Sequence, residues 1–200
     1  MNRPPGDSRN ELSDWLEGFL FDRRITVVRG PLDDMMASRV ATELMTLDAT
    51  GDEPVTFQMD SSGGSLSAAF TLIDVMDVLG VPVNVVCLGR VEGTAVAVAA
   101  AGTHRLALPN ARFRFGDPDC SFEAAASEVE LLAAEHRESL ERYHACLSRF
   151  SGKSGDEVAS WCAARRSLDA LEALEVGLID EVAREKAPLR PIRPLPTARN

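Results

Sequence analysis

The stretch VNVVCLGRVEGTAVAVAAAG, residues 83–102, decides the fold class. It begins as an apolar run that is too short and too rich in β-branched residues for a helix, and the run breaks at Gly89. From residue 93 to residue 102, Thr94 is the single polar side chain. This pattern predicts a buried strand that passes through a tight turn into a buried helix, whose first backbone N–H groups point over the end of the sheet.

The apex of this turn is the first candidate site for chemistry. In hydrolases, a turn between a strand and a helix displays the catalytic nucleophile. Here the apex residues are Glu92, Gly93 and Thr94, so neither a serine nor a cysteine is present. The sequence therefore predicts the framework of an active site without its usual nucleophile.

A second unit of strand, glycine turn and helix precedes the first. Residues 55–59 predict a strand, DSSGGS at 60–65 predicts a turn, and 66–79 predict an apolar helix that ends at Gly80. Two such units in succession imply parallel strands joined by right-handed crossovers, and hence an α/β fold. Glycine-rich turns expose backbone N–H groups at the carboxyl ends of the strands, where α/β proteins bind ligands.

The remaining segments predict a largely helical periphery. We expect a short amphipathic helix over 15–20, a strand over 25–28 that closes at Gly30-Pro31, a helix after Asp33-Asp34, a short strand over 113–115, a long helix over 122–147, helices over 156–164 and 168–175, and a strand over 177–182. The long helix carries a single apolar stripe, which is typical of a helix that packs against another subunit. The stripe consists of Val129, Leu132, Ala133, His136, Leu140, Tyr143 and Leu147. Together with the stripe at 15–20, it argues against a solitary monomer.

Composition and charge limit the classes of function. The chain of 200 residues is 45% hydrophobic and 26% charged, which describes one globular domain that buries about 70% of its unfolded surface. Its net charge is −10 and its pI is near 4.8, so a nucleic acid or an anionic membrane would repel it. We expect reduced thiols and no metal ion, because no C-x-x-C pair or nearby histidine cluster accompanies the four cysteines, Cys87, Cys120, Cys146 and Cys162.

The two ends of the chain predict no ordered structure. Residues 1–13 are polar and hold Pro4, Pro5 and Gly6, so we expect a flexible arm there, and a proline-rich disordered tail over 185–200. The arm lacks an apolar signal core, and no apolar run reaches the ~18 residues needed to span a bilayer. We therefore expect a cytoplasmic protein whose ordered domain covers 14–184.

Four motifs resemble those of ClpP, the proteolytic subunit of the ATP-dependent Clp protease. They are SSGGS at 61–65, the small-residue turn at 89–102, LPNARF at 108–113 and EALEVGLIDEV at 172–182. The resemblance covers roughly residues 14–184, with a short deletion around 103–105. It implies a ClpP/crotonase-like α/β head with parallel βα units, a handle helix at about 122–149, heptameric rings stacked face to face, and a ring-shaped ATPase docked on the outer face. It implies no cofactor.

ClpP is a serine peptidase, so the resemblance implies a Ser-His-Asp triad, in which a histidine takes the serine proton and a carboxylate orients the imidazole. In the family the serine lies in a G-x-x-x-S-M-G turn, and matching its first glycine to Gly89 places Gly93 at the serine position. The histidine follows L-P-N-S-R by three residues, where this chain has Gly116. Counting back from GLID at 177–180 places Arg165 at the aspartate position. We therefore expect no functional triad.

Other parts of the family site are still present. Thr94 matches a position whose backbone N–H helps to form the oxyanion hole, and Gly63 and Gly64 match positions whose N–H groups face an extended peptide. We also expect Arg165 to pair with Glu92 or Asp117 and to fill part of the old cleft. The three histidines are expected to be solvated or packed rather than catalytic: His104, His136 and His144.

Our leading interpretation is a ClpP-like subunit of an ATP-dependent Clp serine protease assembly that has lost its triad and has a structural or regulatory role in ring assembly, as ClpR-type subunits do. Its partners would be copies of itself or active ClpP-type subunits, in heptameric or tetradecameric rings, and a Clp ring ATPase. One alternative is an active serine- or threonine-type endopeptidase that uses Thr94 or an unrecognised base. Another is a crotonase-like acyl-CoA binding protein, although the sequence lacks a basic cluster for the CoA phosphates.

Overall fold

The computed structural model describes residues 9–118 and 126–183, with side chains from 15 to 118 and from 128 to 183. Its elements, in chain order, are α1 (Arg9–Phe21), β1 (Ile25–Leu32), α2 (Asp34–Thr50), β2 (Val55–Gly64), α3 (Leu66–Val78), β3 (Val83–Glu92), α4 (Thr94–Ala100), β4 (His104–Ala107), β5 (Arg112–Arg114), α5 (Ala126–Ser151), α6 (Gly155–Ala163), β6 (Ser167–Asp169), α7 (Ala170–Glu175) and β7 (Glu181–Val182). Helices and strands alternate through most of this order, as an α/β fold requires.

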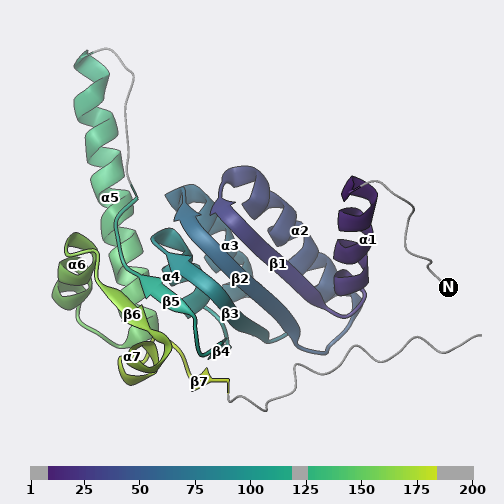
Figure 1. Ribbon diagram of the computed structural model, residues 1–200. Helices are drawn as coiled ribbons and strands as arrows, with labels where there is room; N and C mark the ends of the chain where they lie inside the picture. Colours follow the sequence, from purple (N-terminus) through teal and green to yellow (C-terminus); the bar gives the residue numbers. More distant parts are fainter. Residues whose placement is uncertain (1–8, 119–125, 184–200) are drawn as a thin grey trace, which may run out of the picture.

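The strands of the described residues form one mostly parallel sheet (Figure 1). Its main path runs in the order β1-β2-β3-β4-β7, and every neighbouring pair along it is parallel. The strand β3 pairs with two strands in succession, with β4 through 84–87 and with β5 through 90–92. The short strand β6 adds the one antiparallel pairing of this set, to β5. This topology confirms the predicted α/β class with parallel βα units.

The core lies between the sheet and the helices that cover it. Alternate residues of β2 and β3 are buried, because successive side chains of a strand point to opposite faces. Phe57 of β2 and Val85 of β3 are completely buried, as are Leu44 of α2 and Leu72 of α3. All the residues of α4 are buried, since their small Ala and Val side chains let the helix pack closely on β2 and β3. Figure 1 shows α5 extending well beyond the other elements.

Three strands are longer than the sequence predicts. The strand β1 continues through Gly30-Pro31, β2 continues to Gly64, and β3 passes Gly89. Irregular register after Gly30 and after Met59 keeps the parallel pairing intact across these positions. Pro31 is tolerated because β1 lies at the edge of the sheet, where a missing N–H breaks no ladder hydrogen bond.

Several boundaries of helices and strands near the two ends of the chain also differ from those expected. The helix α1 begins at Arg9, so residues 9–13 are helical rather than part of a flexible arm. The handle helix α5 spans Ala126–Ser151 instead of about 122–149, and 119–125 lie outside the described residues, as do 1–8 and the expected tail at 185–200. A short strand, β6, precedes the last helix, and the final strand is reduced to Glu181–Val182. In the part of the chain that the structure describes, no helix has the length and apolarity that crossing a membrane requires.

Arg105 on β4 joins three segments near the C-terminal end of the domain. Its side chain is 14% exposed, and its Nε and Nη2 donate to the two carboxylate oxygens of Asp180. Its Nη1 donates to the carbonyl oxygens of Phe150 at 3.1 Å and of Gly177 at 3.2 Å. The hydrogen bond from Arg105 holds the pKa of Asp180 below the ordinary value of 3.8.

We expect Arg105→Met to lower the free energy of unfolding at pH 7 by about 2 kcal/mol, because Asp180 and two backbone carbonyls lose a charged donor whose side chain is 14% exposed. The pKa of Asp180 is lower in the folded chain, so this stabilisation is complete above pH 3.8 and declines as the pH falls toward the folded-state pKa. The loss should therefore shrink between pH 7 and pH 3 in urea unfolding experiments. Arg112→Met is the control, because the side chain of Arg112 is 68% exposed and its ion pair with Asp169 is long. Equal stability of Arg105→Met and wild type at pH 7 would contradict the prediction.

Candidate active-site cleft

A pocket of about 690 Å³ opens where β2 and β3 end. The six residues that sequence analysis assigned to the site all line it: Gly63, Gly64, Gly93, Thr94, Gly116 and Arg165. They come from the end of β2, the β3–α4 turn, the segment after β5 and the turn after α6. The fold thus gathers positions that are about a hundred residues apart in sequence around one cavity, at the carboxyl ends of parallel strands.

Gly93 forms the apex of the turn between β3 and α4. Its φ of 52° and ψ of −128° lie in a region that glycine adopts far more readily than residues with a side chain. The backbone is held from both sides, since its N–H donates to the carbonyl of Arg114 and its carbonyl accepts from the hydroxyl of buried Tyr143, both at 2.8 Å. A Cβ at this position would meet only the Gly116 carbonyl, at 3.8 Å. The turn is therefore held in place by its hydrogen bonds, and the space beside Gly93 could take at least the Cβ of a larger residue.

Gly116 and Arg165 lie next to each other, and the Gly116 carbonyl is close to the Gly93 turn. A Cβ built on Gly116 would lie 4.0 Å from Cγ of Arg165. Arg165 has a φ of 47°, and its N–H donates to the Cys162 carbonyl as α6 ends. The positions that the resemblance gives to histidine and aspartate are therefore neighbours, but neither holds a group that accepts a proton at neutral pH.

Two carboxylates of the pocket wall already have cationic or imidazole partners. Glu92 accepts a hydrogen bond from Arg114 at 2.7 Å, and Asp117 lies 2.7 Å from Nε2 of His144. These were the partners that we expected for Arg165. A pairing of Arg165 with either carboxylate stays a prediction. The backbone turn after α6 and the contact of its Cγ with Gly116 place Arg165 beside the cleft.

The expected backbone donors are partly engaged within the chain. The N–H of Gly63 donates to Oγ of Ser61 at 3.1 Å, and the N–H of Gly64 donates to Oγ1 of Thr94 at 2.9 Å. Ser61 and Thr94 are both completely buried. A peptide that used the N–H groups of Gly63 and Gly64 would have to displace these bonds. The Thr94 hydroxyl is enclosed, which does not suit an attacking nucleophile.

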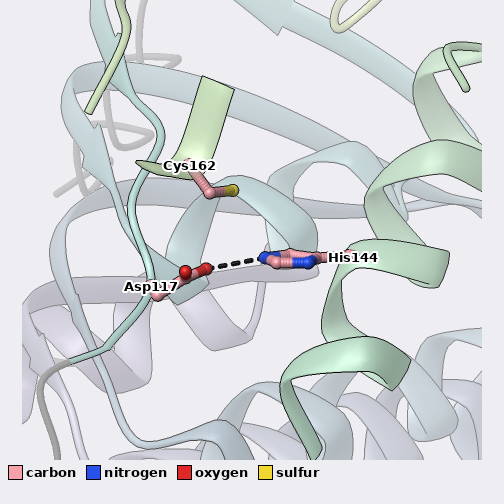
Figure 2. A group of neighbouring side chains, drawn as sticks. All are labelled: Asp117, His144 and Cys162. Carbon is pink, nitrogen blue, oxygen red and sulfur yellow. Dashed lines mark hydrogen bonds and ion pairs between the residues drawn. The ribbon is translucent and has the colours of Figure 1, made fainter. Parts of the chain in front are cut away.

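Sequence analysis missed a cluster formed by Asp117, His144 and Cys162 (Figure 2). The three donor atoms lie within 4.8 Å of one another, although the residues come from the segment after β5, from α5 and from α6. Burial, with a smaller contribution from the Asp117 carboxylate, raises the pKa of Cys162 to about 12. The thiol therefore stays protonated at neutral pH and does not act as a nucleophile. No local pattern in the sequence links these residues, because each belongs to a different element.

The other two histidines have different surroundings. His104 is about half exposed, and its ring nitrogens face Asp180 and Glu181 at 3.9 and 3.6 Å. His136 lines the pocket from α5, one helical turn before Ser139, which also lines it. Sequence analysis placed His136 on the apolar stripe of the handle helix, and its spacing from Ser139 was the available sign that this face of α5 turns toward the cleft.

Comparison with known families is consistent with this architecture. Residues 8–186 match the family model described as Clp protease. The match covers most of the chain and includes every element of the sheet and every residue around the pocket. The resemblance drawn from the four sequence motifs is thereby confirmed, and it carries with it the family's assembly into oligomeric rings. The chain belongs to the Clp protease family.

Proposed function

We propose that this chain is a Clp protease subunit that does not cleave peptides and acts instead in ring assembly. One observation supports the proposal: Gly93, Gly116 and Arg165, which the motifs match to the family triad, all line one pocket. Because the fold brings them together, a misplaced motif is a poor explanation for the missing side chains.

The chemistry of these residues does not support acyl transfer. A glycine has no hydroxyl to attack a peptide carbonyl, and a second glycine has no imidazole to accept the proton. The guanidinium of Arg165 remains protonated, so it neither orients an imidazole as a carboxylate does nor accepts a proton. Since loss of a whole triad removes a factor of ~10⁶ from kcat, little beyond background hydrolysis is expected.

Neither alternative gains support from the pocket. Ser65 caps α3 and donates to Asp34, which leaves Ser62 and Ser139 as the other serine hydroxyls on the wall. A non-standard peptidase would have to use one of these with His136. An acyl-CoA protein needs two available backbone donors, but the N–H groups of Gly63 and Gly64 both donate within the chain.

Exposed apolar side chains support a role as a ring subunit. On α2, Met35 is 79% exposed and Met45 is 58% exposed, and on α5, Leu131 is 61% exposed. Large apolar side chains left in solvent would be buried if these helices contacted another subunit. We propose that these helices contact neighbouring subunits, either copies of this chain or active ClpP-type subunits, in heptameric rings that a ring ATPase engages.

The purified full-length chain is expected to show no mass increase after exposure to a fluorophosphonate probe, while an active ClpP treated in parallel is labelled. The physical reason is the lack of an activated hydroxyl in the cleft. Intact-mass spectrometry measures the result, and peptide mapping locates any adduct. An adduct on Ser62, Ser139 or Thr94 would overturn the inactive-subunit proposal and establish a non-standard peptidase.

The assembly role has its own measurement. Native mass spectrometry of the chain alone, and of the chain co-expressed with an active ClpP-type subunit, reports ring size and composition. Rings that contain this chain support the proposal, and a monomer under both conditions contradicts it.

A further inference from the structure

We propose that Asp117, His144 and Cys162 bind a divalent transition-metal ion, with Zn²⁺ as the best fit. This site adjoins the cleft but uses none of Gly93, Gly116 and Arg165 as ligands, so it does not depend on whether the chain is an inactive subunit. It also replaces our expectation from sequence that the chain binds no metal.

The donor set is already assembled. One oxygen, one nitrogen and one sulfur lie within 4.8 Å of one another, and Oδ1 of Asp117 is 2.7 Å from Nε2 of His144. In Figure 2 the three side chains point toward a common space from three separate segments. Cys162 is 2% exposed, while the side chains of His144 and Asp117 are 19% and 36% exposed. The sulfur thus lies deepest and the carboxylate is nearest to solvent.

The distances are close to those of a tetrahedral zinc site. Bonds of ~2.3 Å to sulfur and ~2.0 Å to nitrogen and oxygen place the donor atoms roughly 3.3–3.6 Å apart. The Asp117–His144 pair must open slightly and the sulfur must approach, with shifts on the order of 1 Å. In the bound form, the neutral imidazole of His144 carries its proton on Nδ1, so that Nε2 and the Asp117 carboxylate both face the ion. The thiol proton of Cys162 is released to solvent, so one proton leaves for each ion bound.

The donor types select the ion. A thiolate and an imidazole favour Zn²⁺ or Co²⁺, whereas Mg²⁺ and Ca²⁺ prefer oxygen ligands alone. The negative charges of the Asp117 carboxylate and the Cys162 thiolate balance the double charge of the ion. Asp117 also lines the pocket, which gives the ion a route of entry and leaves the fourth coordination position for a water molecule.

A bound ion would link the wall of the cleft to the handle helix α5. Asp117 directly follows Gly116 in the cleft wall, His144 lies on α5, and Cys162 lies in the last turn of α6. A bound ion would join these three segments by coordinate bonds, in place of the hydrogen bond between Asp117 and His144.

Titration of the metal-free, full-length protein with Co²⁺ tests the proposal. We expect a thiolate-to-cobalt charge-transfer band in the near ultraviolet and the d–d bands of a four-coordinate site, which saturate at one equivalent per chain and disappear when Zn²⁺ is added. Cys162→Ser should abolish the charge-transfer band, and Asp117→Asn and His144→Gln should each weaken binding at least ~10-fold. Zn²⁺ should raise the Tm of the wild type by more than it raises the Tm of these variants at the same concentration.

Two matched controls separate this site from other thiols. Cys146→Ser changes a half-buried thiol on α5, two residues from His144, and should leave the cobalt spectrum unchanged. Cys120→Ser, outside the described residues, should do the same. A wild-type protein without the charge-transfer band, a band that survives Cys162→Ser, or a band lost only in Cys120→Ser would overturn the proposal. Circular dichroism verifies that each variant is folded, and the polar substitutions Asp117→Asn and His144→Gln keep the test decisive if Cys162→Ser unfolds.

Discussion

The triple variant Gly93→Ser/Gly116→His/Arg165→Asp is expected to react covalently with a fluorophosphonate probe, whereas the wild type and each single variant are not. The Cβ atoms of the new residues meet no clash, because a Cβ on Gly93 meets nothing nearer than 3.8 Å and one on Gly116 nothing nearer than 4.0 Å, and both positions open into the pocket. The φ of 47° at position 165 also suits aspartate better than most residues.

The size of the gain can be estimated from the triad itself. A complete triad contributes ~10⁶ to kcat, and a misplacement of about 1 Å costs ~10²-fold. Even an imperfect restored triad should therefore hydrolyse a peptide substrate ~10³-fold to ~10⁴-fold faster than the wild type. A serine at the Gly93 backbone conformation costs roughly 1–3 kcal/mol of stability, so the variant should also unfold more easily.

The control is Gly93→Ala/Gly116→His/Arg165→Asp, which has the same backbone demands but no hydroxyl. It should remain unlabelled under conditions where the serine variant is labelled. If the serine variant folds, assembles as the wild type does and still fails to react, then Gly93, Gly116 and Arg165 do not stand at the triad positions and the proposed loss of function needs another basis.

Gly64→Ala is expected to lower the free energy of unfolding by about 3–5 kcal/mol, a large fraction of the total for a domain of this size. A Cβ on Gly64 would lie 2.0 Å from the carbonyl oxygen of Leu32 and 2.6 Å from its carbonyl carbon. These are backbone atoms of the neighbouring strand, so no side-chain rotation relieves the clash. The ends of β1 and β2 must separate, and the hydrogen bond from Gly64 to Thr94 is strained as well.

Urea unfolding followed by circular dichroism measures this loss. Gly18→Ala is the matched control, because Gly18 lies inside α1 and nothing lies within 4 Å of a Cβ placed there. That substitution should stabilise the chain by up to ~1 kcal/mol, since alanine is a better helix former than glycine. A Gly64→Ala variant within 1 kcal/mol of the wild type would show that β1 and β2 do not approach each other in this way.

The behaviour of the glycines shows how far the sequence determined the fold. Their pattern indicated two successive βα units, which the structure confirms, but it placed strand ends before Gly30, at Met59 before the turn with Gly63, and at Gly89. In the structure these strands continue. A Cβ on Gly63 would meet the Glu92 carbonyl at 2.5 Å, so the glycine allows neighbouring strands to approach closely rather than ending one. The need for a glycine at this position comes from the neighbouring strand, which cannot be identified from the segment around Gly63 alone.

The candidate site was predictable to a similar extent. Family motifs located Gly93, Gly116 and Arg165 separately, and the structure places them around one pocket. The cluster of His144 with Asp117 and Cys162 was not predictable, because it depends on how α5 and α6 pack beside the end of β5. The helical stripe marked Tyr143 as a core residue, but it gave no information on what the next residue along the helix would face.

The pairing of β3 with two strands has a consequence for how such a chain evolves. Residues 84–87 bind β4 in the middle of the sheet, and residues 90–92 bind β5 and lead directly into the Gly93 turn. The floor of the cleft and the centre of the sheet are therefore one continuous piece of backbone. Selection for stable folding alone would therefore preserve the shape of this cleft, so the shape by itself is not evidence of activity.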